Sequence, residues 1–343
     1  MWHGSSSPSP RSPSGRLRPS ATGYGEGRGE GAVPQAQIRG ERPSPGSLRD
    51  PSSPRKRGEV KAAAKCNALQ EELDRAVFAA NRAQGRVSIG LAASAGVTRR
   101  TTTREDGSLR VRFPGACAGA PEAVLVNTAG GIAGGDHFAV DLALDAGAQL
   151  VVTTAAAEKI YRSLGPNACV DVTATVADGA ELVWLPQETI LFDRARLART
   201  VAIALAPTAT LLFAETIVFG RAAMGETVRE GHFTDRWRVR RAGRLIFADN
   251  FRLDGPIADR LNETAIAGGR TAIGTVLMAP GDDAAVAAVR AAFGQFHGEV
   301  GISGWGGIAL ARLAAPDGAA LRHDLVALLS ALGRPALPRN GLS

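Results

Sequence analysis

Cysteine and aromatic residues are scarce in this chain of 343 residues. It holds three cysteines, and Phe, Trp and Tyr together make up 5% of the residues. No two cysteines form a CxxC pair, which argues against a disulfide scaffold and against a thiolate zinc site. So few cysteines are typical of a protein from a reducing compartment, and we expect a cytoplasmic location.

Long apolar runs and metal-ligand motifs are also missing from the sequence. No run reaches the roughly eighteen apolar residues of a membrane-spanning helix. The five histidines are scattered without an HxH or HExxH pattern, no Walker lysine follows the glycine-rich stretch, and no GxSxG is present. We therefore expect no membrane span, no closed metal site, no tightly bound cofactor and no serine nucleophile.

The positive charge of the chain is unevenly distributed. The net charge is +7, and residues 1–65 carry essentially all of the excess, so the remainder is balanced and we expect no nucleic-acid partner. Residues 1–67 are rich in Pro, Ser, Gly and Arg and poor in large aliphatic residues, which predicts a disordered basic extension. This extension is interpreted as an inert segment, as the product of a wrongly chosen upstream start codon, or as a basic or targeting arm. Residues 68–343 are predicted to form a single β domain.

Three similar segments occur in the middle of the sequence: Ala146–Thr154, Asp178–Pro186 and Ala206–Glu215. In each, an alanine precedes a polar residue, a leucine and two large apolar residues, and a second strand-like run follows. Alternation of apolar and polar residues, with abundant Val, Ile, Thr and Phe, predicts strands. A repeat of roughly thirty residues is typical of stacked architectures. We predict a mostly β, layered, β-helix-like (solenoid-like) body of stacked short strands, and prefer it to a sandwich or a propeller fragment.

Helical patterns are strongest near the C-terminus. Asp282 is a good N-cap for the segment DDAAVAAVRAAFGQF, and a second helix is predicted from about Ala319 to a stop at Gly333. Between these two helices, the segment VGISGWGGIALARL predicts one or two strands.

Two unusual stretches suggest polar features of the fold. The glycine-rich segment Asn127–Phe138 requires positive φ angles or a close backbone approach. It is either a tight crossing between strands or a backbone-lined passage closed by Asp136 and His137. The segment Glu158–Ser163 puts charges on both faces of a strand and contains the only lysine after residue 65, which suggests an interface or a polar channel, with chance composition as the alternative.

Two glutamates occupy matching places in the repeats. Glu188 and Glu215 each begin an ET-I stretch, so stacking of the repeats would place them one strand spacing apart. Paired carboxylates suit a hydrolase or lyase, a divalent cation, or a structural ion pair with Arg221.

Four ordered motifs in this sequence resemble the UreD (also called UreH) family of urease accessory proteins. They are NTAGGIAGGD, the run from Thr153 to Ser163 that ends in K-x-Y-R-S, WLPQETILFD, and the ExxVFGRxAxGE pattern of Glu215–Glu226. The resemblance extends from about Phe78 to about Leu332. The basic extension has no counterpart in the family, and the AAAE before Lys159 replaces residues that are more polar in the family.

The resemblance implies a non-catalytic maturation factor. Members of the family act with UreF and the GTPase UreG on apo-urease, and this complex inserts nickel into the urease active site, with UreE as the usual nickel donor. The resemblance also implies a layered β-helix-like body with two helices, docked on urease on one side and on UreF on the other. Nickel is then in transit through an internal polar tunnel and is not a bound cofactor.

Transfer of the family motifs to this sequence implies two groups of site residues. Asp136, Glu188, Glu215 and Asp193 are expected to be tunnel groups that offer weak oxygen contacts, since a metal that must be passed on is poorly served by a closed site. The expected partner-contacting or structural polar residues are Lys159, Tyr161, Arg162, Ser163, Arg221 and Glu226.

An alternative interpretation is a β-solenoid polysaccharide hydrolase or lyase that uses Glu188, Glu215 and Arg221. Such an enzyme would be expected to carry a secretory signal and an aromatic-lined cleft. The sequence shows no apolar signal segment and few aromatic residues. A nucleic-acid-binding role would rest on the basic extension alone.

Overall fold

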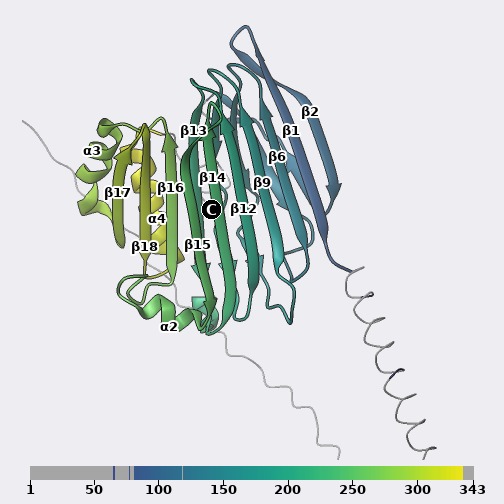
Figure 1. Ribbon diagram of the computed structural model, residues 1–343, viewed down its shortest axis with the longest axis vertical. Coiled ribbons are helices and arrows are strands. Elements are labelled where there is room, and N and C mark those ends of the chain that lie inside the picture. Colours follow the sequence, from purple (N-terminus) through teal and green to yellow (C-terminus); the bar gives the residue numbers. More distant parts are fainter. Residues whose placement is uncertain (1–64, 66–76, 78–80, 118, 335–343) are drawn as a thin grey trace, which may run out of the picture. The chain divides into compact units, whose positions relative to one another are not determined.

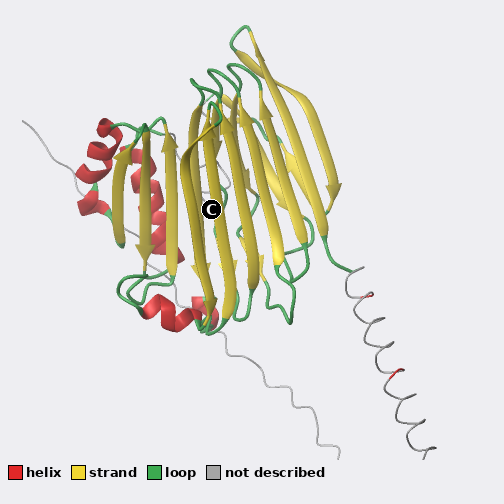
Figure 2. Cartoon of the chain, viewed as in Figure 1, coloured by secondary structure: helices red, strands yellow, loops and turns green. Residues whose placement is uncertain are grey.

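Strands dominate the described part of the chain (Figures 1 and 2). The computed structural model describes residues 65, 77, 81–117 and 119–334. The predicted disordered extension, residues 1–67, lies outside these residues except for Lys65. The mostly β fold predicted from the repeats is confirmed.

The first sheet has seven strands in the order β15-β14-β12-β9-β6-β1-β2. Its middle strands are parallel from β1 to β14, and the hairpins β1–β2 and β14–β15 close its two edges. The strands are β1 (Gln84–Ser94), β2 (Val97–Gly107), β6 (His137–Leu144), β9 (Ala168–Val176), β12 (Arg196–Leu205), β14 (Gly231–Arg241) and β15 (Arg244–Gly255).

The second sheet follows the order β17-β18-β16-β13-β10-β7-β5-β3, with three short strands, β4, β8 and β11, beside this path. The pairs β5–β7, β7–β10 and β10–β13 are parallel, whereas β13 and β16–β18 pair in antiparallel fashion. The strands are β3 (Leu109–Arg112), β4 (Ala116–Cys117), β5 (Ala120–Asn127), β7 (Gln149–Thr154), β8 (Glu158–Ile160), β10 (Glu181–Trp184), β11 (Thr189–Leu191), β13 (Thr210–Phe219), β16 (Ala272–Ala279), β17 (Glu299–Trp305) and β18 (Ile308–Ala315).

The chain alternates between the two sheets from β6 to β14. Each coil contributes one strand to the first sheet, and to the second sheet either two short strands (β7 and β8, β10 and β11) or the single strand β13. The predicted repeats coincide with these coils, because Leu150, Leu182 and Leu211 lie side by side in register. The alanine that precedes each polar residue of the repeat is buried, and its N–H donates to the carbonyl three residues earlier in every coil. A small residue is needed at this tight corner, and the β-helix-like stacking is confirmed.

The second sheet is covered on both faces. Phe213 on β13 faces the first sheet and packs in one cluster with Phe233 and Trp237 of β14. Its neighbour Leu212 faces the other way and packs in a cluster with Leu321 of a C-terminal helix. Burial on both faces explains why β13 is an almost continuous apolar run. Two helices near the C-terminus, α3 (Asp283–Ala291) and α4 (Gly318–Ala331), lie beside β16, β17 and β18 (Figure 1).

The described helices are α2 (Ile257–Asn262), α3 (Asp283–Ala291) and α4 (Gly318–Ala331), with short 3-10 turns at Ala222–Met224 and Phe293–Gln295. The Asp282 carboxylate accepts the N–H of Ala285 at 2.8 Å, which confirms the predicted N-cap. Gly333 has φ +62°, and the helix end is closed by the N–H of Arg334 on the carbonyl of Leu329, a Schellman motif.

Both C-terminal helices and the strands between them are confirmed, whereas α2 was not predicted because it is short and begins directly after a proline. Among the described residues, no helix combines the length and the apolar character needed to span a membrane.

Candidate functional site

The pairing of strands in the second sheet is interrupted between two rows of paired residues, because the segments that connect these rows differ in length from coil to coil. Val152, Trp184 and Phe213 lie side by side, and so do Glu158, Thr189 and Ile217. The connections between these two rows are residues 153–157, 185–188 and 214–216, so they shorten from coil to coil. Only the shortest stays within a continuous strand, β13, and the two longer ones leave a hollow between the sheets.

This hollow is a cavity of about 330 Å³. Its walls are largely apolar, with Leu125, Phe138 and Leu197 among them. The exposed residues of its lining, which include Gly130 and Lys159, mark its mouth. The polar groups of the lining are Asn127, Thr154, Glu158, Lys159, Gln187, Thr189, Arg199 and Glu215.

Glu158 is the carboxylate nearest the mouth of the cavity. Burial raises the pKa of its carboxyl to about 7, and a hydrogen bond from Asn127 Nδ2 at 3.0 Å opposes this rise. The same Asn127 amide donates to the carbonyl of Gly131 at 3.1 Å and so ties the glycine-rich loop to β8. The pKa of Glu158 therefore falls near neutral pH, where both charge states of this carboxyl are accessible.

A buried ion network lies at the deep end of the cavity. Arg199 on β12 donates from Nε to Asp235 Oδ1 at 3.0 Å and from Nη2 to Oδ2 at 2.5 Å, and from Nη1 to Glu215 on β13. The indole N–H groups of Trp184 and Trp237 donate to Glu215 at 2.9 Å and to Asp235 at 2.8 Å. Both carboxylates and the guanidinium are more than nine-tenths buried. With both carboxylates ionised, this arginine–carboxylate network carries one net negative charge.

Burial affects the pKa of both the acidic and the basic groups of this network. Burial raises the pKa of the Glu215 carboxyl, although the Arg199 guanidinium opposes the rise. Burial alone would lower the pKa of Arg199, but the two neighbouring carboxylates outweigh it and the pKa is raised. The guanidinium is therefore permanently charged, and it is held in place by its two acidic partners.

Two further cavities lie on the other side of the arginine–carboxylate network from the first cavity. A small one of about 20 Å³ is lined by Arg199, Glu215 and Asp235 and shares the first two with the first cavity. A third, of about 690 Å³, adjoins the small one at Thr275 and Arg312. The three hollows thus form a line in which neighbours share lining residues, and the arginine–carboxylate network lies where the first hollow meets the small one.

The two glutamates expected to stack in adjacent coils are not paired. Thr189 lies opposite Ile217, so Glu188 is level with Thr216 and faces the helices, whereas Glu215 faces the first sheet. Glu188 accepts a hydrogen bond from Arg322 Nε on α4 at 2.9 Å. The prediction that both carboxylates share a site is therefore wrong, because the two ET-I stretches lie one residue out of register in the sheet. They cannot flank one bond of a polysaccharide.

Asp136 and Asp193 bind backbone amides. Asp136 accepts the N–H of Ala83 at 2.9 Å and of Ala133 at 2.7 Å, and Asp193 accepts the N–H of Arg229 at 2.8 Å. Neither aspartate is among the described residues that line the three cavities. Of the four expected tunnel carboxylates, the structure places only Glu215 in the line of hollows.

The family motifs converge around the ring of Phe192. The Arg221 guanidinium lies 4.1 Å from the ring centroid and donates from Nε to Glu226 at 2.7 Å. Tyr161 meets Phe192 edge to face at 5.2 Å and donates its hydroxyl to the carbonyl of Gly130 at 2.8 Å. The four motifs that are far apart in the sequence therefore form one polar and aromatic edge beside the first cavity.

The remaining expected polar residues lie near this edge. Lys159 is exposed at the mouth of the first cavity. Ser163 donates its hydroxyl to the carbonyl of Pro166 at 2.7 Å, and exposed Arg162 forms an isolated backbone bridge with Ala195.

Sequence reasoning included Glu158 only as part of the charged segment Glu158–Ser163, and it missed Arg199 and Asp235. The sequence does contain a sign of the last two. Arg199 lies between Leu197 and Val201 on the same inward face of β12, where a charged residue is unexpected. Asp235 occupies the corresponding inward position of β14, directly opposite Arg199. A charged residue in an inward apolar series thus marks the network.

Comparison with known proteins gives one consistent result. A family model described as "UreD urease accessory protein" matches residues 83–341. A protein of Rhodopseudomonas palustris (strain HaA2) named "Urease accessory protein UreD" is 57% identical over 266 residues, which cover 78% of this chain and 95% of the relative. "Urease accessory protein UreD 3" of Bradyrhizobium sp. (strain BTAi1 / ATCC BAA-1182) is 52% identical over 263 residues, or 77% of this chain and 95% of the relative.

Proposed function

The chain belongs to the UreD family of urease accessory proteins, and from this premise we propose that it is a non-catalytic factor that passes nickel to apo-urease in the cytoplasm. In this proposal it acts together with UreF and the GTPase UreG, whose GTP hydrolysis accompanies insertion, and it receives nickel that UreE supplies. Nickel is the cargo of the protein.

The observation that supports nickel passage is the line of three hollows in the β body. Carboxylates occur along it at Glu158, Glu215, Asp235, Asp249 and Glu299. None of the described residues that line the three hollows is a histidine or cysteine. Oxygen donors alone bind a borderline cation such as Ni²⁺ weakly, which suits a metal that must move on.

In this structure the arginine–carboxylate network blocks the proposed path between the first two hollows. Arg199 occupies the junction of the first two hollows and neutralises one of the two carboxylates there. A divalent cation at Glu215 would meet the guanidinium at close range, so its passage requires Arg199 to move. In this proposal, docking of the partner proteins supplies the change that opens the junction.

Nickel loading of urease in a strain that lacks this gene tests the proposal. The strain is complemented with the wild-type chain, with Glu158→Gln or Glu215→Gln, or with Asp141→Asn as a matched control. Asp141 is a carboxylate on the first sheet that is bound to Arg86 at 2.6 Å and lies away from the hollows. We expect urease without nickel in the deletion strain, full restoration by wild type and Asp141→Asn, and reduced nickel content with the other two variants.

The two parts of the proposal fail differently. Fully loaded urease in the deletion strain contradicts the maturation role. Full loading with both Glu158→Gln and Glu215→Gln, at normal protein levels, contradicts the path through the hollows and leaves the maturation role intact.

A further inference from the structure

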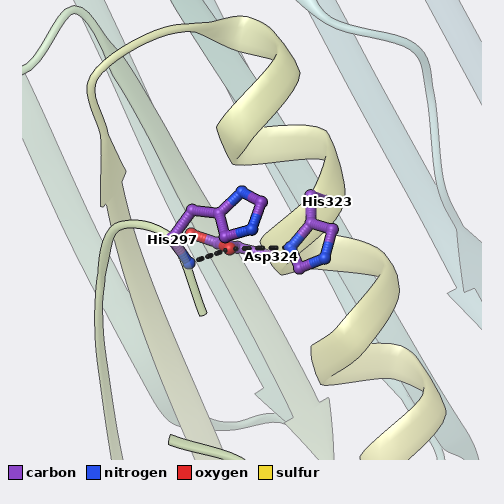
Figure 3. A group of neighbouring side chains, drawn as sticks. All are labelled: His297, His323 and Asp324. Carbon is purple, nitrogen blue, oxygen red and sulfur yellow. Dashed lines mark hydrogen bonds and ion pairs between the residues drawn. The ribbon is translucent and has the colours of Figure 1, made fainter. Parts of the chain in front are cut away.

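Two histidines and an aspartate from separate elements meet at the helix-bearing side of the second sheet (Figure 3). His297 precedes β17, and His323 and Asp324 lie on α4. The two imidazole rings are stacked, with centroids 3.8 Å apart and planes within 2° of parallel. One potential ligand atom from each of the three side chains lies within 4.8 Å of the others.

The aspartate fixes this cluster to the fold. Asp324 is completely buried, and its two oxygens accept the N–H of His297 at 2.7 Å and of Gly298 at 2.8 Å. Its Oδ1 lies 3.3 Å from His323 Nδ1. The backbone that carries His297 is thereby fastened to the helical turn that carries His323, while both imidazoles remain exposed.

We propose that His297, His323 and Asp324 form a surface site for a late first-row divalent cation of the Ni²⁺ and Zn²⁺ class. Two imidazole nitrogens and one carboxylate oxygen are the donors that such cations prefer, whereas Ca²⁺ and Mg²⁺ favour all-oxygen sets.

The spacing of the donors fits one ion. Cation–donor bonds of about 2.0–2.2 Å place adjacent donors about 3 Å apart. The contact of 3.3 Å between Asp324 and His323 is already close to this value. Rotation of the two exposed rings brings the third donor in from within 4.8 Å. Because a carboxylate has about four lone-pair positions, Asp324 can keep its backbone contacts and still bind the cation.

The site has open coordination positions and a defined place in the molecule. Three protein donors leave the rest of the coordination sphere to water, so the cation can exchange. The residues on either side of His297, Phe296 and Gly298, both line the third hollow. The site therefore lies beside that hollow. Its existence does not depend on the proposed nickel path, because it is built from a different set of side chains.

Calorimetric titration of the untagged full-length chain with Ni²⁺ tests this site. Every sample carries His3→Ala, so that the imidazole of the amino-terminal segment does not contribute. The test variant is the double substitution His297→Gln and His323→Gln. The matched control is His137→Gln, because His137 is a half-exposed histidine that lies 2.8 Å from the carboxylate of Asp171.

We expect the parent and the His137→Gln protein to bind about one Ni²⁺ per chain with equal affinity. The double variant should bind at least about tenfold more weakly, as is usual when coordinating or orienting groups are removed. Zn²⁺ should compete with Ni²⁺, and a large excess of Mg²⁺ should not. Thermal melting of all proteins without metal shows whether the substitutions preserve the fold.

The assignment is overturned if the parent binds neither Ni²⁺ nor Zn²⁺. It is also overturned if the folded double variant binds as tightly as the His137→Gln control. Both outcomes are read on the purified protein, so they leave the proposed role in urease maturation untouched.

Discussion

Replacement of Arg199 by methionine would remove the only cation of the described arginine–carboxylate network while filling a similar volume. The change deletes the hydrogen bonds to both oxygens of Asp235 and the one to Glu215. Each carboxylate keeps a single indole donor, from Trp184 or Trp237. We expect the free energy of unfolding at pH 8 to fall by about 4 kcal/mol, because removal of one partner leaves buried charges without compensation.

This loss should depend on pH with a definite sign. Burial already raises the pKa of Glu215 above its ordinary value of 4.5, and without the guanidinium the folded variant binds a proton that the unfolded chain releases. A carboxyl with a raised pKa in the folded state destabilises the fold increasingly as pH rises, by about 1.4 kcal/mol per pH unit for one proton. The deficit of Arg199→Met should therefore be smaller at pH 6 than at pH 8.

Urea unfolding followed by tryptophan fluorescence measures this deficit, since Trp184 and Trp237 contact the network directly. The matched control is Arg196→Met on the same strand, where the side chain donates only to neutral Asn167 at 3.0 Å. The control should lose about 1 kcal/mol or less at both pH values. Wild-type stability of Arg199→Met at pH 8, or a deficit that grows toward pH 6, would refute the reasoning.

Two further predictions concern the first cavity. Glu158→Gln removes a carboxyl whose pKa is about 7 in the folded chain. At pH 8 the variant should be more stable than wild type by about 2 kcal/mol, after allowance for a weaker bond to Asn127, and the gain should vanish near pH 5; equal urea midpoints at pH 8 would contradict this. Gly131 has φ +140°, and a Cβ there would lie 2.4 Å from the Tyr161 ring. Gly131→Ala should lower the melting temperature by about 4 °C or more, whereas Gly165→Ala, which meets open space, should not; equal melting of both variants would contradict the steric argument.

The stacked fold could be predicted from the sequence because its determinants are local. Ala148, Ala180 and Ala209 mark the tight corner of each coil, and the apolar pattern after each corner repeats in register. The helix ends were equally readable, since Asp282 and Gly333 act through atoms only a few residues away.

The arginine–carboxylate network could not be predicted in the same way. Arg199, Glu215 and Asp235 come from strands in two sheets, and their contact depends on the inter-sheet register as well as on the repeat. The pairing predicted for Glu188 and Glu215 failed for a related reason. The two ET-I stretches pair one residue out of register, and an offset of one residue places a side chain on the other face of a strand.

The covering of β13 by α4 has a consequence for folding during synthesis. Leu212 and Ala214 on the outer face of β13 are buried in one cluster with Leu321 and Leu328, which the ribosome adds much later. Until α4 has left the exit tunnel, the coils are complete but one apolar face is bare, and such a face is prone to aggregation. The nascent chain therefore buries this apolar face only once α4 has been synthesised. Truncation before Leu321 should give an insoluble product even though every coil is present.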